Sequence, residues 1–166
     1  FLHDIEAGHY DRYVDLAIGD FDLINPAQRL ALGLEPDSSV GTLVASVSNS
    51  GSCDGMLEEG DVLLSIDGRE IASNGYVEVD GEFVNMNEIV ERRFKGDKVD
   101  MKILRDGKPK TVEIELKPFD PYLIQANTYD KRPRYATFAG LTFQPLDRNL
   151  MAAHNIESMA ARSLIW

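Results

Sequence analysis

The residues that could carry catalysis are one serine in a segment of small residues and two histidines near the start of the chain. Asn49-Ser50-Gly51 has the residue types found around a serine nucleophile, but the residues that flank this triplet, Ser48 and Ser52, are not glycines. Serine catalysis also requires a histidine to take the hydroxyl proton and an aspartate to orient that histidine. His3 and His9 lie in a lead-in segment, and nothing around Ser50 indicates a protease-sized barrel. We therefore expect no catalytic residue in this chain.

The lead-in segment also carries residue types that bind metals. These are His3, Asp4, Glu6 and His9. Their spacing matches no closed zinc pattern and no cysteine lies nearby, so a solvated segment is the simpler interpretation. The lone Cys53 is expected to be a buried small hydrophobic residue and not a nucleophile. The sequence thus predicts no metal and no cofactor.

Composition and charge exclude several kinds of partner. The chain has 166 residues, with 17 Lys+Arg against 28 Asp+Glu and a formal net charge of −11. Such a charge repels phosphate, so nucleic acid is not an expected partner. No apolar run approaches the roughly 18 residues that would indicate a membrane span. Because the chain opens at Phe1 without a basic-then-apolar leader, we interpret it as a piece of a longer polypeptide.

The elements that must position any site begin with two strands. Residues 42–48 alternate in polarity, which predicts a strand with one buried face. The residues expected on that buried face are Leu43, Ala45 and Val47. The apolar run 62–66 predicts a second strand, and Asp67-Gly68 is typical of a tight turn into a short return strand, 69–71.

Further along, polar and apolar segments alternate. Residues 72–82 indicate a polar excursion, followed by a helix over 85–94 that Asn85 and Glu88 cap. Alternating apolar residues over 99–103 and 112–116 predict a hairpin. Its turn is expected at Asp106-Gly107.

The last part of the chain reads as a linker and a new unit. Pro118 and Pro121 end the preceding block, and residues 119–133 have linker composition. Residues 135–143 look like a loop that enters a strand, and 148–162 are predicted as an amphipathic helix.

This order of elements, with Leu57-Glu58-Glu59-Gly60-Asp61-Val62-Leu63-Leu64-Ser65-Ile66-Asp67-Gly68 at its centre, resembles a PDZ domain of HtrA/Deg serine proteases. Segments 10–18 and 25–34 also resemble the entry to this module in that family, and segments 103–108 and 138–146 look like the tandem-PDZ branch represented by plant Deg proteases. The resemblance implies an α+β, mainly β fold: a partly open, PDZ-like β-barrel or sandwich with two helices, circularly permuted. It divides the chain into a tether from a missing protease domain (1–12), a PDZ domain (13–118), a linker (119–134) and a truncated start of a second PDZ domain (135–166).

The resemblance also implies a peptide-binding site. Backbone amides of a loop hold a terminal carboxylate, and the following strand edge pairs with the ligand opposite a helix, which is β-augmentation. The residues carried over are Asp15, Leu16, Ala17 and Ile18 for the loop, Gly19 for the edge, and Met86, Ile89 and Val90 for the helix wall.

Two departures from the family pattern bear on the ligand. Ala17 replaces the usual loop glycine, and its Cβ restricts the backbone and the approach of a ligand. Asp15, Asp20 and Asp22 place negative charge where an anionic terminus would arrive. An internal segment, or a peptide with basic residues behind its terminus, suits these acids better.

The expected function is recognition of substrate or regulatory peptides, including unfolded-protein segments, for a protease domain of the same polypeptide. The fragment itself is not expected to be an enzyme, whereas its parent would be a serine endopeptidase. The alternative is a structural module, with its groove filled by its own chain or by a neighbouring subunit of a homo-oligomer. An adaptor unrelated to a protease is a third possibility. The resemblance implies a periplasmic or cell-envelope location in bacteria and an organellar one in eukaryotes.

Overall fold

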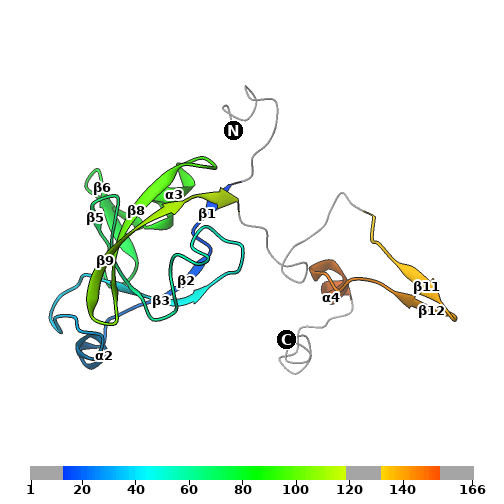
Figure 1. Ribbon diagram of the computed structural model, residues 1–166, viewed down its shortest axis with the longest axis horizontal. Coiled ribbons are helices and arrows are strands. Elements are labelled where there is room, and N and C mark those ends of the chain that lie inside the picture. The colour runs from blue at the N-terminus through cyan, green and yellow to red at the C-terminus, as the bar shows by residue number, and fades with distance from the viewer. Residues whose placement is uncertain (1–12, 119–131, 154–166) are drawn as a thin grey trace. The chain divides into compact units, whose positions relative to one another are not determined.

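The computed structural model describes residues 13–118 and 132–153, which belong to two compact units, Phe1–Phe119 and Asp120–Trp166 (Figure 1). Each unit is described by itself. In the described ranges no helix is long and apolar enough to cross a membrane. The predicted tether and most of the predicted linker lie outside these ranges.

The first unit is built on an open antiparallel sheet. Its strands follow the order β2 (Ile18–Phe21), β3 (Thr42–Val47), β4 (Val62–Ile66), β8 (Lys98–Arg105) and β9 (Lys108–Glu115), and β5 (Arg69–Glu70) pairs with β4. Two small pairs, β1 (Val14–Asp15) with β10 (Lys117–Pro118) and β6 (Tyr76–Val79) with β7 (Glu82–Asn85), complete the strands. Within residues 13–118 the helices are α2 (Pro26–Ala31) and α3 (Asn87–Glu91). The predicted mainly β class is confirmed, with two helices in this described range, and the sheets do not close into a barrel.

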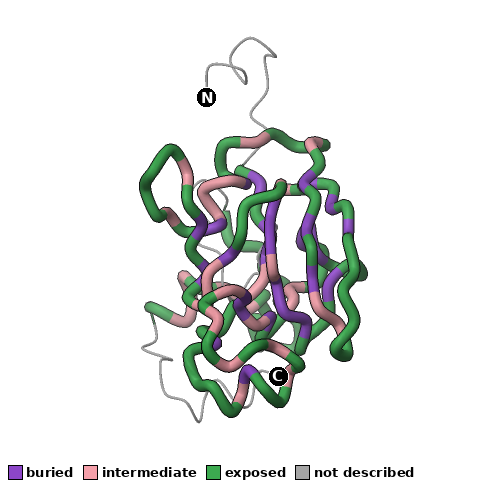
Figure 2. Tube along the Cα trace, turned by 90° about the vertical axis from the view of Figure 1, so that its left-hand side faces the viewer, coloured by how far each residue is buried: buried purple, intermediate pink, exposed green. Residues whose placement is uncertain are grey.

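The core of this unit follows the predicted periodicity most closely in the β8–β9 hairpin. Val99, Met101 and Ile103 are buried on β8, opposite buried Val112 and Ile114 on β9. The turn falls at residues 106–107 as predicted, both with positive φ. Buried residues run along the strands in Figure 2, so this hairpin supplies one wall of the core.

The predicted buried face of β3 is wrong. Thr42 and Val44 are buried, whereas Leu43 is only partly buried and Ala45 is exposed. The Thr42 hydroxyl donates a 3.1 Å hydrogen bond to the carbonyl of Phe21, which satisfies a polar group that would otherwise be costly to bury. Which face of β3 is buried thus depends on the neighbouring strands and not on the hydrophobicity of β3 alone.

Three further predictions needed correction around the second helix. The polar excursion is in fact the hairpin β6–β7, with Val77 fully buried and a turn at residues 80–81. The helix is shorter than the predicted 85–94, since α3 ends at Glu91. The predicted Asn85 cap is also wrong, because Asn85 is the last residue of β7 and Met86 is the N-cap; the Asn85 side-chain oxygen accepts the Asn87 N–H at 3.0 Å.

The second unit contains a short hairpin and a helix. Strands β11 (Ala136–Phe138) and β12 (Leu141–Phe143) pair antiparallel, so the predicted loop entering a strand is a hairpin. Helix α4 spans Arg148–Ala153, within the predicted helix. Residues 154–162 of that prediction lie outside the described residues.

Candidate functional site

The strand β2 lies at the end of the strand order, where it pairs only with β3 among the described strands. Its register sets Ile18 against Val47 and Gly19 against Ser46, with an irregularity just after Gly19. The outer edge of such a strand presents unpaired main-chain donors and acceptors. This edge can therefore accept an additional strand.

The loop that leads into β2 is held from behind by residues 48–53. The carbonyl of Ala17 accepts the Ser48 N–H at 2.9 Å, and the carbonyl of Asp15 accepts the Ser52 hydroxyl at 2.5 Å. Ser52 also accepts the Lys117 N–H at 2.9 Å, which ties β10 to the same loop. Several long-range hydrogen bonds thus fix the backbone at the start of β2.

Ala17 adopts the left-handed conformation, with φ of 57°, at the position where the resemblance described above implies glycine. Its methyl group lies over Gly51, because a Cβ built on Gly51 would be only 2.4 Å from the Cβ of Ala17. Ala17 is 7% exposed, so the methyl group is enclosed by the loop at residues 48–51. The absence of a side chain at Gly51 is what makes room for alanine here.

Gly51→Ala is expected to lower the free energy of unfolding by about 1–3 kcal/mol, because the two methyl groups would overlap. Urea unfolding of the single variant and of the double variant with Ala17→Gly measures the effect. The second substitution removes the clashing group and should recover most of the loss. Equal destabilisation in the single and the double variant would contradict the packing described here.

The helix wall is mostly core. Met86 and Val90 are fully buried, as is Leu16 of the loop, while Ile89 and Ile18 are partly buried against the same core cluster. Helix α3 contacts β1, and its start is anchored by the Met86 N–H, which donates to the Gly75 carbonyl at 2.9 Å. Ile18 and Ile89 are thus the predicted apolar residues with surface left for a ligand, above a floor of buried side chains.

A surface pocket of about 610 Å³ lies apart from the predicted residues. It is lined by residues of β5, the β6–β7 hairpin and the segment 39–40, including Tyr76 and Phe83. Sequence reasoning missed it because the hairpin that forms one wall was read as a polar excursion.

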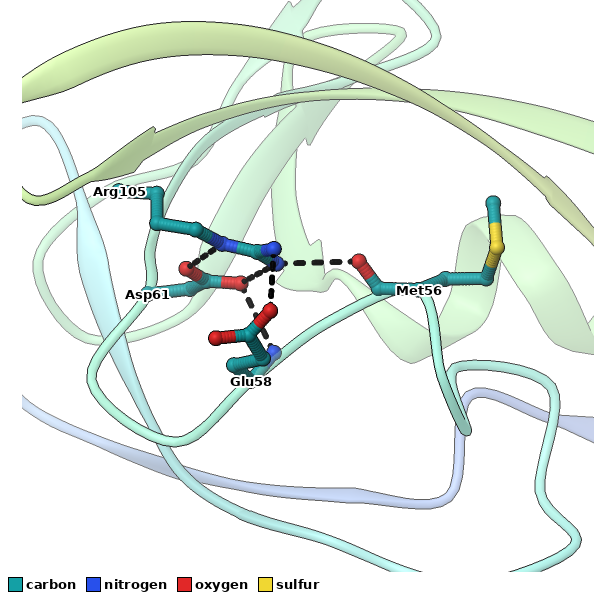
Figure 3. Close-up of polar contacts among 4 residues, drawn as sticks. All are labelled: Met56, Glu58, Asp61 and Arg105. Atoms are coloured by element: carbon teal, nitrogen blue, oxygen red, sulfur yellow. Dashed lines mark hydrogen bonds and ion pairs between the residues drawn. The ribbon is translucent and has the colours of Figure 1, made fainter.

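A polar network centres on Asp61, at the entry to β4 (Figure 3). Arg105 donates to both carboxylate oxygens of Asp61, at 2.8 and 2.7 Å, and also to Glu58 at 2.5 Å and to the Met56 carbonyl at 3.1 Å. Asp61 is 2% exposed. Burial raises the pKa of Asp61, but the hydrogen bonds from Arg105 and the Glu58 N–H outweigh burial and lower this pKa below its usual value. The network fixes the turn before β4 and is structural.

Cys53 lies in the core under the loop. Burial, with a contribution from the charge of Asp15, raises the pKa of this thiol to about 12. Such a thiol is not nucleophilic at neutral pH. Within residues 13–118 and 132–153, no three His, Cys, Asp or Glu side chains are grouped to hold a metal ion.

Comparison with known proteins gives the family. A PDZ domain model matches residues 26–116, more than half of the chain. The chain belongs to the PDZ domain family. This PDZ chain is 31% identical over 153 residues to "Protease Do-like 2, chloroplastic" and 30% identical over 142 residues to "Protease Do-like 4, mitochondrial", both from Arabidopsis thaliana. The matches cover 91% and 85% of the chain but only 25% and 27% of those proteins.

Solved structures agree with this assignment of the PDZ chain. Two structures of the HtrA-type protease AlgW with decapeptide are 28% identical to it, with TM-scores of 0.53 and 0.50. The matches cover 73% and 70% of this chain and 33% and 32% of those chains. The predicted resemblance to PDZ regions of HtrA/Deg proteases is confirmed, and the chain spans about a quarter of the curated relatives' length. It corresponds to their PDZ part and not to a catalytic domain.

Proposed function

We propose that this PDZ chain binds peptides by strand addition to the free edge of β2. The observation that carries the proposal is the edge position of β2, which begins at a loop whose backbone is fixed from behind. A strand added there would gain main-chain hydrogen bonds that depend little on its sequence. Two similar solved structures are of an HtrA-type protease with decapeptide, which supports a peptide as the class of ligand.

In this proposal the ligand lies between β2 and α3. Ile18 and Ile89 contact ligand side chains, above the buried floor of Leu16, Met86 and Val90. Gly19 contributes main chain only, since a Cβ there would come within 2.6 Å of the Ser46 hydroxyl. The floor sets the depth of the site, and the two isoleucines set its preference for apolar side chains.

Fluorescence anisotropy of labelled peptides against the 166-residue chain tests the proposal. Ile89→Lys is expected to weaken peptide binding by about tenfold or more, because a charge replaces apolar contact area at the site. Ile24→Lys is the matched control, since Ile24 is 69% exposed outside the proposed site and receives the same charge. An equal loss in both variants, or no loss in Ile89→Lys, would count against this site.

The wider role is proposed from the relatives. A module of this kind in an HtrA/Deg-like serine endopeptidase would deliver substrate or regulatory peptides, including unfolded-protein segments, to the protease domain of the same polypeptide or gate that domain. The names of the relatives, chloroplastic and mitochondrial, support an organellar location in a eukaryote. A periplasmic or cell-envelope location is the corresponding proposal for a bacterial source.

The second unit is proposed to be the start of a second PDZ domain. Ala17 precedes α2 and Ala139 precedes α4 by the same number of residues, and both alanines have positive φ. The Asn25 side chain caps the first turn of α2, and the Asp147 side chain caps the first turn of α4. Tyr13 and Tyr135 occupy matching positions before these helices. Residues 135–153 thus repeat the spacing of residues 13–31, the entry to the first domain.

One observation favours the structural alternative. The hairpin β11–β12 carries large apolar side chains that are 55–76% exposed: Tyr135, Phe138, Leu141 and Phe143. Exposed apolar groups at this density are typical of a surface that another chain covers. Light scattering distinguishes the two functions. A monomer that binds peptide favours recognition, and an oligomer that binds none favours assembly.

A further inference from the structure

The loop before β2 already binds a carboxylate of its own chain. The backbone N–H of Ala17 donates a 2.9 Å hydrogen bond to a side-chain oxygen of Asp15. This amide is one of those in the loop at residues 15–18 that the family resemblance assigns to a peptide carboxylate. The donor is therefore occupied when no ligand is present.

A second carboxylate lies on the strand that the ligand would join. Asp20 lies on β2, and its carboxylate reaches toward the loop at Gly75, where an added Cβ would be 2.7 Å from it. Lys117 stands opposite Asp15 in the β1–β10 pair and is the cation that the register brings nearest. One lysine beside two carboxylates leaves the strand edge with an acidic excess.

We propose that Asp15 is a specificity-determining residue that directs this site to internal peptide segments and disfavours free C-termini. A terminal carboxylate that used the Ala17 N–H would have to displace the carboxylate of Asp15, since one N–H cannot serve two anions well. The displaced side chain would then lie close to a group of the same charge. The inference rests on the proposed peptide binding and names its ligand class.

An internal segment meets neither obstacle. Strand addition to β2 uses main-chain groups from Ile18 onward, which leave the hydrogen bond between Asp15 and Ala17 intact. Asp15 then acts as a built-in substitute for the ligand carboxylate. Peptides with basic residues gain from the same acids that repel an anionic terminus.

The test compares one peptide sequence in three forms, with a free C-terminus, with an amidated C-terminus and placed internally, by anisotropy against the 166-residue chain. We expect the wild type to bind the internal and amidated forms at least as tightly as the free form. Asp15→Ala should tighten binding of the free form by about tenfold and change binding of the amidated form by less than about twofold. Asp15→Asn keeps a hydrogen-bond acceptor but removes the charge, so its gain should be smaller.

Asp37→Ala is the matched control, because it removes the same charge from an exposed position outside the loop and β2. Circular dichroism of each variant reports whether the fold is kept. A wild-type preference for the free carboxylate, or an unchanged free-to-amidated ratio in Asp15→Ala, would overturn the inference while peptide binding itself stands. Absence of binding by every form to every variant would overturn the proposed function as well.

Discussion

Arg105→Ala is expected to destabilise the domain by about 3 kcal/mol, which is a large part of the stability of a small domain. The guanidinium donates to both oxygens of Asp61, and its removal leaves a carboxylate that is 2% exposed without its cation. The Arg105 side chain is itself 21% exposed, which keeps the expectation at the lower end of the range for buried pairs. Urea unfolding at pH 7 measures the loss.

The same substitution should change how stability depends on pH. In the wild type the pKa of Asp61 is lowered, so its contribution is present above the usual carboxyl value of 3.8 and is lost as pH falls through the folded-state pKa. Without Arg105, burial still raises this pKa, and only the hydrogen bond from the Glu58 N–H and the charge of Lys110 oppose it, so the pKa of Asp61 is higher than in the wild type. The variant should therefore regain stability, relative to the wild type, as pH falls from neutrality toward 4.

Two controls make this expectation specific. Lys98→Ala removes a cation from an ion pair in which both side chains are more than half exposed, and should change stability little. Adding Asp61→Asn to Arg105→Ala removes the buried charge and should abolish the new pH dependence. A pH profile of Arg105→Ala parallel to that of the wild type would refute the account of this network.

Arg29→Ala is expected to cost about 3 kcal/mol as well, because the buried guanidinium ties three separate segments together. Arg29 of α2 is 1% exposed and donates to the carbonyls of Leu23, Glu35 and Val40 at 3.0, 3.0 and 2.7 Å. Alanine would leave three carbonyls without this donor and a cavity between the end of β2 and residues 35–40. Denaturant unfolding of the variant measures the loss.

Arg29→Lys separates the contribution of the charge from that of the guanidinium geometry. Lysine keeps the charge, but its compact ammonium lacks the planar fork that reaches carbonyls in different directions. We expect a loss between those of the wild type and Arg29→Ala. A lysine variant as stable as the wild type would show that charge, and not the fork geometry, is what this position requires.

Local features of the chain were readable from the sequence because they depend on a few neighbouring residues. The Asp67-Gly68 and Asp106-Gly107 turns follow from the tolerance of these residues for positive φ. The β8–β9 hairpin, which has the second of these turns at its tip, follows from two long runs of period two. The motif at residues 57–68, together with the order of elements and the flanking segments, indicated a PDZ domain, and the comparisons confirmed this family.

The start of α2 carries a helix signal in its sequence, although no helix is predicted there in the sequence analysis. Asn25 caps the helix with its side-chain oxygen 2.9 Å from the Ala27 N–H, and Pro26 occupies the first turn, a common start pattern. This segment serves in the sequence analysis only as evidence for the family resemblance. Its buried arginine was missed because a charged residue on a short helix is ordinarily assigned to solvent.

The tertiary structure alone decided the long-range pairings that shape the site. Arg105 meets Asp61 because the sheet sets β4 beside β8, with Val62 opposite Leu104. Ala17 fits because Gly51, from a distant loop, lacks a side chain. Turn positions and strand patterns could be predicted from the sequence because they depend on local backbone preferences, and the family could be predicted because short segments of sequence resemble it. Which face of β3 is buried, and which groups meet at the start of β2, depends on strand order and register, because these bring together residues that are far apart along the chain.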